Sequence, residues 1–318
     1  MRLLFVSATR VGDAILSTGL LGRLIDDHPG LRVTVACGPA AASLFDAVPG
    51  LERVIVLDKM PLSLHWLRLW VRCAPRLWDI VVDLRNAPLV YALAKRKAYR
   101  VTGGRSEDHR LVHLARVMGL QADPPQPRLW TDAGHDARAR TLIPGGPPVL
   151  AVGPTANWAA KTWRPERFAE LVTRLTGPGG ILPGGRVALF GRDDERPQAL
   201  QLIQALPPDR LIDLVGGMDL LDVFACFRRA AFYVGNDSGL MHLAAAAGIP
   251  TLGLFGPSPV NQYGPCGTLS ATVQTRIPYA EIFPPNFDPK ASGTLMDSLE
   301  VDDAEAAARA LWTRREAA

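Results

Sequence analysis

The fold is indicated first by the stretch Val234-Gly235-Asn236-Asp237-Ser238-Gly239-Leu240-Met241-His242-Leu243-Ala244-Ala245-Ala246. An apolar strand ends here, and Asn-Asp-Ser-Gly opens a helix of small residues. Asn, Asp and Ser are preferred helix N-caps, and the first free N–H groups of such a helix attract anions. The pattern therefore predicts a strand-to-helix turn with room for an anion, although plain capping without a ligand would produce the same pattern.

Outward from this stretch, short apolar runs alternate with helical segments. Residues 12–27 carry apolar side chains at helical spacing. Helices are also predicted at 165–175, where a proline stands in the first turn, and at 301–315. Continuous apolar strands separated by helices indicate parallel sheets covered on both faces. The predicted strands are residues 3–6, 33–36, 54–57, 80–83, 149–152, 187–190, 211–214, 232–234 and 251–254.

Residues 121–148 interrupt this alternation with six prolines and two adjacent glycines. This composition is typical of a connection between domains. The sequence therefore predicts an α/β protein of two doubly wound, Rossmann-like domains that face a central cleft. The domains are predicted to span residues 1–147 and 148–318. In such folds ligands bind at the carboxyl ends of the strands.

The chain has 318 residues, a net charge of +4 and a pI of about 9.0. This mild excess permits an anionic ligand, but the absence of a long Lys/Arg run or a nucleic-acid motif predicts no nucleic-acid partner. The short basic stretch Lys95-Arg96-Lys97 with Arg100 is interpreted as a solvated helix end. Four scattered cysteines, no signal-peptide core and no apolar segment of ~20 residues predict a cytoplasmic protein.

Four further motifs accompany the first stretch in a fixed order: Arg10-Val11-Gly12-Asp13, residues 157–168, residues 190–196 and residues 214–221. Together with the block Asn236–Pro257, they resemble glycosyltransferase family 9, the ADP-heptose:lipopolysaccharide heptosyltransferases and their relatives of GT-B fold. The resemblance covers nearly the full length, and the block Asn236–Pro257 is its most specific part.

The resemblance implies an inverting glycosyltransferase that moves a sugar, heptose from ADP-heptose, to a lipopolysaccharide core or similar saccharide. It implies that the first domain binds the acceptor and the second the nucleotide sugar, and that the last helix can pack back on the first domain. Asp13 matches the catalytic aspartate, which would accept the acceptor's proton. Complementing a helix N-terminus is the alternative role of Asp13.

The resemblance also implies a donor site in the second domain. Lys161 matches the lysine that meets the donor phosphates, a role that suits a mobile point charge. Asp237, Ser238, Gly239 and His242 match the diphosphate-binding turn. Backbone N–H groups and the Ser238 hydroxyl would hold phosphate oxygens there, while Asp237 would fix the turn or contact the sugar.

Two further residues are matched to the nucleoside. Glu195 would bind the ribose hydroxyls, although Asp193 and Asp194 lie close enough to take that role. Met218 falls where the family brackets the base, and a simple loop or core methionine is the alternative. Arg164 departs from the family pattern, which often has proline there, and this departure puts the local loop geometry in doubt.

The first domain contains Trp66 and Trp70, four residues apart, and Arg68 and Arg72 at the same spacing. On a helix each pair lies on one face, and Trp with Arg suits a membrane interface. The hypothesis is a peripheral contact with the cytoplasmic face of the inner membrane, where a glycolipid acceptor would be presented. An ordinary amphipathic helix in the outer layer of the sheet is the alternative.

Other functions remain open at this point. No His/Asp/Glu cluster has metal-ligand spacing, so no metal and no other cofactor are expected beside the nucleotide-sugar substrate. A nucleotide-sugar epimerase of the same fold is one alternative, and a non-catalytic two-lobed binding protein is another. A dehydrogenase is not favoured, because neither domain's first strand leads into GxGxxG.

Overall fold

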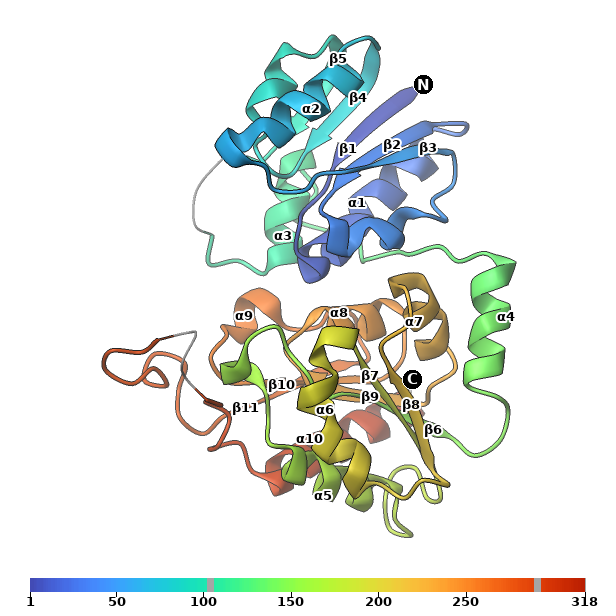
Figure 1. Cartoon of the computed structure of the whole chain (residues 1–318), viewed down its shortest axis with the longest axis vertical. Coiled ribbons are helices and arrows are strands. Elements are labelled where there is room, and N and C mark those ends of the chain that lie inside the picture. The colour runs from blue at the N-terminus through green and yellow to red at the C-terminus, as the bar shows by residue number, and fades with distance from the viewer. Residues whose placement is uncertain (102–105, 289–292, 318) are drawn as a thin grey trace. The chain divides into compact units, whose positions relative to one another are not determined.

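The computed structural model describes residues 1–101, 106–288 and 293–317. The chain forms two compact units, Met1–Asp132 and Ala133–Ala318 (Figure 1). The division comes before the expected end of the first domain at residue 147. The reason is helix α4 (Ala133–Leu142), which lies inside the expected connection and packs on α7 (Leu220–Phe227) of the second unit.

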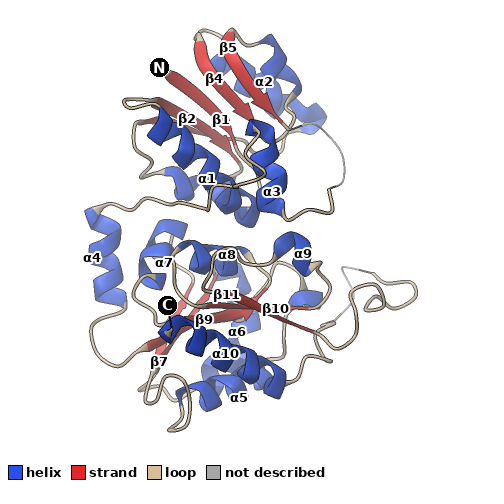
Figure 2. Ribbon diagram, turned by 180° about the vertical axis from the view of Figure 1, so that it is seen from behind, coloured by secondary structure: helices blue, strands red, loops and turns tan. Residues whose placement is uncertain are grey.

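The first unit is built on a five-stranded parallel sheet with strand order β3-β2-β1-β4-β5. Helix α2 lies over one face of the sheet in Figure 1, and α1 and α3 lie over the other face in Figure 2. The elements are β1 (Arg2–Val6), α1 (Val11–Asp27), β2 (Arg32–Cys37), β3 (Leu51–Val56), α2 (Leu64–Cys73), β4 (Trp78–Asp83), β5 (Lys95–Arg100) and α3 (Arg110–Ala115).

Strand β5 corrects the interpretation of Lys95-Arg96-Lys97 with Arg100 as a helix end. The segment pairs in parallel with β4, from Trp78 opposite Lys95 to Asp83 opposite Arg100. It is an edge strand of its sheet, a position where lysine and arginine protect the unpaired backbone from further pairing. The charges that suggested a solvated helix end therefore belong to a solvated strand.

Helix α2 places its two tryptophans differently from its two arginines. Trp66 and Trp70 are half-buried and pack against the core beneath the helix, and the Arg85 guanidinium lies 4.6 Å from the centroid of the Trp66 ring. Arg68 and Arg72 are exposed. Of the four residues expected to form a membrane contact, only the arginines therefore lie fully on the surface.

The second unit contains a six-stranded parallel sheet with strand order β11-β10-β9-β6-β7-β8. Its strands are β6 (Val149–Gly153), β7 (Arg186–Gly191), β8 (Leu211–Val215), β9 (Phe232–Asn236), β10 (Thr251–Phe255) and β11 (Ser270–Gln274). Its remaining helices are α5 (Pro165–Thr176), α6 (Arg196–Ala205), α8 (Gly239–Ala246), α9 (Val260–Tyr263) and α10 (Val301–Glu316). Every predicted strand overlaps an observed one, and the two parallel sheets confirm the predicted fold class.

The last helix, α10, packs within the second unit, and the return to the first domain that the resemblance allows stays a prediction. Ala304, Ala308 and Leu311 are buried in one core with Phe168 and Leu171 of α5. Burial of apolar surface against its own sheet accounts for this position of α10.

Both sheets reverse their strand order beside their first strand. In the first sheet the reversal lies between β1 and β4, and in the second it lies between β6 and β9. Such switch points open a crevice at the carboxyl ends of the strands, where ligands of doubly wound folds bind. Across the described residues, none of the helices combines the length and the apolar character that a membrane crossing requires.

Short 3-10 helices complete the described chain. They are η1 (Pro39–Phe45), η2 (Pro61–Ser63), η3 (Pro88–Ala92), η4 (Arg116–Met118), η5 (Ala159–Lys161) and η6 (Asp193–Glu195).

Candidate functional site

The residues matched to a donor site all follow strands of the second sheet. Lys161 ends η5 in the loop after β6, and Asp237 and Ser238 follow β9 directly. Glu195 lies after β7 and Met218 after β8. Because these strands are parallel neighbours, the loops after them lie together at the carboxyl-end edge of the sheet. The switch point between β6 and β9 lies at the same edge.

The centre of this edge is an ion pair between Lys161 and Asp237. Lys161 Nζ lies 2.5 Å from Asp237 Oδ2. The lysine side chain is 22% exposed and the aspartate side chain 8%. An ammonium group carries three N–H donors, so one contact with Asp237 leaves Lys161 able to meet an anion as well. Asp237 thus fixes the lysine, an arrangement that sequence spacing did not suggest.

Asn236 fixes the loop that carries Lys161. Its side chain is fully buried, donates from Nδ2 to the Pro154 carbonyl at 2.8 Å and accepts at Oδ1 from the Trp163 backbone N–H at 3.1 Å. The two contacts lie on either side of Lys161 in the chain. The end of β9 therefore holds both ends of the loop after β6, and each buried backbone group has its partner.

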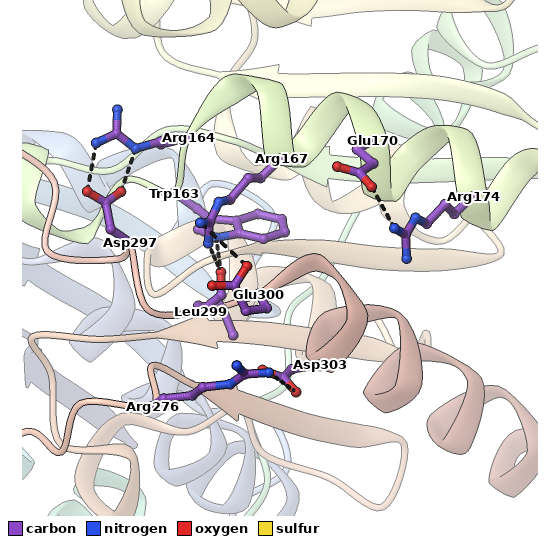
Figure 3. A network of polar contacts seen from close by, with 10 residues as sticks. All are labelled: Trp163, Arg164, Arg167, Glu170, Arg174, Arg276, Asp297, Leu299, Glu300 and Asp303. Atoms are coloured by element: carbon purple, nitrogen blue, oxygen red, sulfur yellow. Dashed lines mark hydrogen bonds and ion pairs between the residues drawn. The ribbon is translucent and has the colours of Figure 1, made fainter.

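Residues 294–299, which precede α10, also hold the loop that carries Lys161. Thr294 Oγ1 donates to the Thr162 carbonyl at 2.6 Å, and the Leu295 N–H donates to the Ala160 carbonyl at 3.0 Å. Trp163 Nε1 donates to the Leu299 carbonyl at 3.0 Å (Figure 3). Lys161 therefore projects from a loop whose backbone and neighbouring indole are both bonded to residues 294–299.

Ion pairs extend this contact along α5. Arg164 makes two hydrogen bonds to Asp297, at 2.5 and 2.7 Å. Arg167 donates to the Leu299 carbonyl and lies 3.5 Å from Glu300 (Figure 3). Arg164, where the family often has proline, therefore makes a bidentate contact with Asp297 in the segment 294–299. This contact holds the local loop geometry that the departure from the family pattern had put in doubt.

The N-terminus of α8 lies directly after Asp237. Ser238 is the N-cap residue, but its hydroxyl makes no capping hydrogen bond to the helix. Gly239 is the first residue of the helix, and His242 is 5% exposed in its second turn. The first N–H groups of a helix lack intrahelical partners, so this turn offers backbone donors beside the lysine.

Two glycines make room for Tyr233 beneath this edge. A Cβ atom at Gly153 would lie 2.2 Å from the Tyr233 hydroxyl oxygen, and one at Gly235 would lie 2.4 Å from it. Tyr233 is fully buried, and burial raises the pKa of its phenol. The phenol thus fills the space at the ends of β6 and β9 that two side chains would otherwise occupy.

Glu195 is bonded inside the protein. Its Oε2 accepts from the Thr155 hydroxyl at 2.8 Å and from the Arg192 backbone N–H at 3.1 Å. Glu195 is 7% exposed. It therefore ties the turn after β7 to the loop after β6, and its expected contact with a ribose remains a prediction.

The loop after β8 holds Met218, which is half-buried. Gly216 and Gly217 precede it with φ of +93° and +66°, a region that favours glycine. The Gly217 N–H donates to Asp193 Oδ1 at 3.1 Å. Asp193 therefore serves the loop that contains Met218, while Asp194 pairs with Arg192 on the surface.

Asp13, the candidate base, lies in the first unit. It stands in the first turn of α1, which follows the end of β1. Arg110 at the start of α3 donates from Nε to Asp13 Oδ1 at 2.8 Å, and the two side chains are 28% and 18% exposed. Nothing in the sequence pattern pointed to Arg110, because the two residues are joined only by the contact between α1 and α3.

Three side chains between α4 and α7 could bind a metal ion. One ligand atom each from His135, Asp219 and Asp222 lies within 4.8 Å of the others. Burial, and then the charge of Asp219, raises the pKa of Asp222. Arg138 Nε, however, lies 3.2 Å from Asp222 Oδ2 and supplies positive charge there. Sequence spacing did not suggest this cluster, and the expectation of no metal remains a prediction.

The residues that sequence reasoning missed are Asn236, Thr155 and Arg110. The sequence pattern pointed to Asn236 only as a residue that favours helix N-caps. Its position at the end of an apolar strand also indicates a buried polar group. Such a group needs partners. Thr155 follows its strand without any distinguishing pattern.

Comparisons with known proteins identify the family of this chain. The model of glycosyltransferase family 9 (heptosyltransferase) matches residues 72–281. Lipooligosaccharide heptosyltransferase 2 of Haemophilus influenzae is 26% identical, with 86% of this chain and 88% of that protein covered. Lipopolysaccharide heptosyltransferase 1 of Pseudomonas aeruginosa is also 26% identical, with 81% and 79% covered.

Solved structures show the same fold. The ADP-heptose lps heptosyltransferase II of E. coli superposes with a TM-score of 0.75 at 20% identity, over 99% of this chain and 100% of that one. A family 9 glycosyltransferase of Veillonella parvula gives a TM-score of 0.79 at 18% identity, over 98% and 97%. The family model covers more than half of the chain. The chain is therefore a glycosyltransferase that belongs to family 9, the heptosyltransferase family.

Proposed function

We propose that this chain transfers heptose from ADP-heptose, with inversion, to a saccharide acceptor of the lipopolysaccharide-core type. The observation that carries the proposal is the Lys161–Asp237 ion pair beside the N-terminus of α8. A lysine and free helix N–H groups at one sheet edge suit the diphosphate of a nucleotide sugar.

Departure of the nucleoside diphosphate leaves negative charge that must be stabilised. Lys161 would meet one phosphate, while the N–H groups at Ser238 and Gly239 would meet the other. Such fixed donors favour a reaction most where charge develops in the transition state. Asp237 would keep the ammonium in place, because its own carboxylate repels phosphate.

The nucleoside would lie over the neighbouring loops. Met218 would contact the base, beside the left-handed turn of Gly216 and Gly217. Glu195, close to the end of β7, would approach the ribose hydroxyls through Oε1, which lies 3.5 Å from Arg192 Nη2, since Oε2 is used by Thr155. His242 would support the turn from within α8.

Asp13 would act as the base for the acceptor hydroxyl. Arg110 holds Oδ1, so we assign the proton to Oδ2. A carboxylate held in one orientation is a better proton acceptor than a freely rotating one, because the geometry for transfer is already set. The acceptor oxygen would then attack the anomeric carbon as the diphosphate leaves from the opposite face.

A related structure supports the choice of donor. The E. coli heptosyltransferase WaaC was solved with ADP and with ADP-2-deoxy-2-fluoro heptose. These proteins are 19% identical to this chain. The donor of this chain therefore needs its own test.

The test is thermal unfolding with ADP, GDP, UDP and CMP in separate samples. A ligand at ~100 times its Kd stabilises by about 2.7 kcal/mol, and about 2–4 °C accompanies each kcal/mol in a unit of this size. A shift of the midpoint with ADP alone is expected, followed by ADP release from ADP-heptose only when the acceptor is added. A shift with UDP or GDP alone would overturn the heptose donor. Conversion of the donor without an acceptor would favour an epimerase.

Two accompanying features are also proposed, the compartment of the reaction and its independence of a metal ion. We place the reaction in the cytoplasm, because all four cysteines are free thiols and a reducing compartment keeps them so. We also propose that the reaction needs no metal, since Lys161 and the helix end supply the positive charge. Turnover should then be unchanged by EDTA, and restoration of lost activity by a divalent ion would contradict the proposal.

A further inference from the structure

Helix α2 presents leucine and valine side chains to solvent. Leu64, Leu67 and Val71 are 43%, 48% and 58% exposed, and Leu62 in the preceding turn is 94% exposed. These four residues lie within ten positions of one another in the first unit. Single exposed apolar residues need no explanation, whereas a contiguous group marks an interaction site.

Helical geometry places three of these side chains on one stripe. Successive residues are about 100° apart around a helix, so Leu64, Leu67 and Val71 point to the same side. The opposite side carries His65, Leu69 and Cys73, which are buried against the sheet. The apolar stripe therefore lies on the outward side of α2, which Figure 1 shows on the face of the sheet away from α1.

The borders of the stripe have the residue types of a lipid interface. Arg68 and Arg72 are exposed along one border, and the half-buried Trp66 and Trp70 lie along the other. No acidic residue occurs in Leu64–Cys73, and in the parts of the chain that the structure describes neither arginine has an acidic partner. The surface therefore combines exposed hydrocarbon with unpaired positive charge.

The turn before α2 is strained in a way that exposes Leu62. Leu62 and Ser63 have φ of +51° and +58°, a left-handed conformation that is unfavourable for side chains other than glycine. Strain of this kind persists where the surrounding structure uses it. Here it turns a large apolar side chain outward beside the stripe.

We propose that Leu62, Leu64, Leu67 and Val71, with Arg68 and Arg72, form a docking surface for a membrane that carries anionic lipids. This surface, the α2 stripe, would lie in the interface with its leucines among the upper acyl chains and its arginines at the phosphates. The inference is independent of the donor chemistry. It also revises the expected membrane contact, because the leucines replace the tryptophans as the inserted side chains.

Charge distinguishes this occupant from a protein partner. Arginine also occurs in protein interfaces, but α2 carries two exposed arginines and no acidic residue from Leu64 to Cys73, so its exposed side complements a uniformly anionic surface. Each arginine near an anionic surface contributes about 1 kcal/mol. Lys59, just before the turn, adds a further cation, while Asp58 is the neighbouring carboxylate that offsets it.

The test is co-sedimentation of the full chain with vesicles of phosphatidylcholine alone and of phosphatidylcholine mixed with phosphatidylglycerol. Wild-type protein should pellet with the anionic vesicles and stay in solution with the neutral ones. The double variant Arg68→Gln/Arg72→Gln should bind about 30-fold more weakly, the equivalent of the two arginine contributions. The triple variant Leu64→Ser/Leu67→Ser/Val71→Ser should lose at least about tenfold.

Leu200→Ser provides the matched control, because Leu200 is 47% exposed on α6 of the second unit. This variant should pellet like wild type, and the midpoint of thermal unfolding without ligand should be similar in all four proteins, which excludes unfolding as the cause. The proposal is overturned if wild type ignores anionic vesicles, or if the triple variant binds as wild type does. It is equally overturned if sedimentation equilibrium shows a dimer that the triple variant abolishes, since a second copy would then cover the stripe.

Discussion

Asp13 and Asp237 occupy similar places in the two units and are held very differently. Each follows a parallel strand of its sheet, and each pairs with a cation of its own unit. Asp237 pairs with a lysine whose loop is fixed by Asn236 and by residues 294–299. Among the described residues, Asp13 is held by one side-chain contact, with Arg110 of α3, which is distant in the sequence but packs on α1.

The difference suits the two roles proposed for these carboxylates. A group that holds a lysine against a phosphate must be rigid and shielded, and Asp237 is only 8% exposed. A group that takes a proton from an incoming hydroxyl must be reachable, and Asp13 is 18% exposed with one oxygen bonded to Arg110. Four substitutions test this contrast.

The largest effect is expected from Asp13→Asn. The amide keeps the size and the hydrogen bonding of the site but cannot accept a proton, so kcat should fall by roughly 10²–10⁴, the usual contribution of a general base. ADP binding, followed by thermal shift, should be unchanged. A fall in ADP affinity with normal kcat would place Asp13 in the donor site and reverse the comparison.

The next largest effect is expected from Asn236→Ala, which removes the two side-chain hydrogen bonds that hold the loop carrying Lys161. The Trp163 N–H and the Pro154 carbonyl would each lose a buried partner, at about 1–3 kcal/mol per group. The midpoint of thermal unfolding should fall, and the KM for the donor should rise by more than kcat falls. Asn236→Asp keeps the acceptor for Trp163 and should retain more donor affinity than the alanine variant. Equal donor affinity in both variants would mean that the hydrogen bond from the Trp163 N–H to residue 236 does not position Lys161.

Lys161→Ala should act mainly on the donor. A hydrogen bond to a charged group contributes about 1.5–3 kcal/mol, so ADP affinity should fall by roughly 10- to 100-fold. Lys161→Arg should recover part of the loss, because it restores the charge beside Asp237 without the same compact shape. Isothermal titration with ADP measures both variants. Wild-type affinity in Lys161→Ala would remove the lysine from the diphosphate site.

The smallest effect is expected from Arg110→Gln. Partly exposed ion pairs contribute up to about 1 kcal/mol, which corresponds to about a fivefold loss of kcat through a less fixed Asp13. Donor affinity should not change. Steady-state kinetics at saturating donor give the value, and a loss as large as that of Asp13→Asn would show that Arg110 itself contacts the acceptor.

Much of the fold could be predicted from the sequence, because apolar strands and cap residues are local signals. The strands of both sheets and helices α1, α5 and α10 were predicted close to their observed bounds. Strands β5 and β11 were not predicted, because Lys95–Arg100 and Ser270–Gln274 have no continuous apolar run. Both are edge strands that pair with β4 and β10. Helix α4 was hidden by the prolines on either side of it.

The candidate site was predictable only as a set of separate loops. Lys161 and Asp237 were both named from the family resemblance, but their mutual contact depends on the adjacency of β6 and β9, which a linear pattern does not contain. The same holds for Arg110 beside Asp13. The tryptophans of α2 were expected on the surface, whereas the buried side of a helix is fixed by its position on the sheet rather than by its residue types.

The bonds between residues 294–299 and the lysine loop also set an order of events while the chain is made. Every strand of the first sheet lies before Asp132, so that unit has its complete core while translation is still under way. The second sheet needs α10, with Ala304, Ala308 and Leu311, before its strands β10 and β11 are covered. Domains fold as units during synthesis, and a nascent second unit therefore waits with apolar surface exposed. Lys161 is among the first donor-side residues to be translated and among the last to be fixed in place.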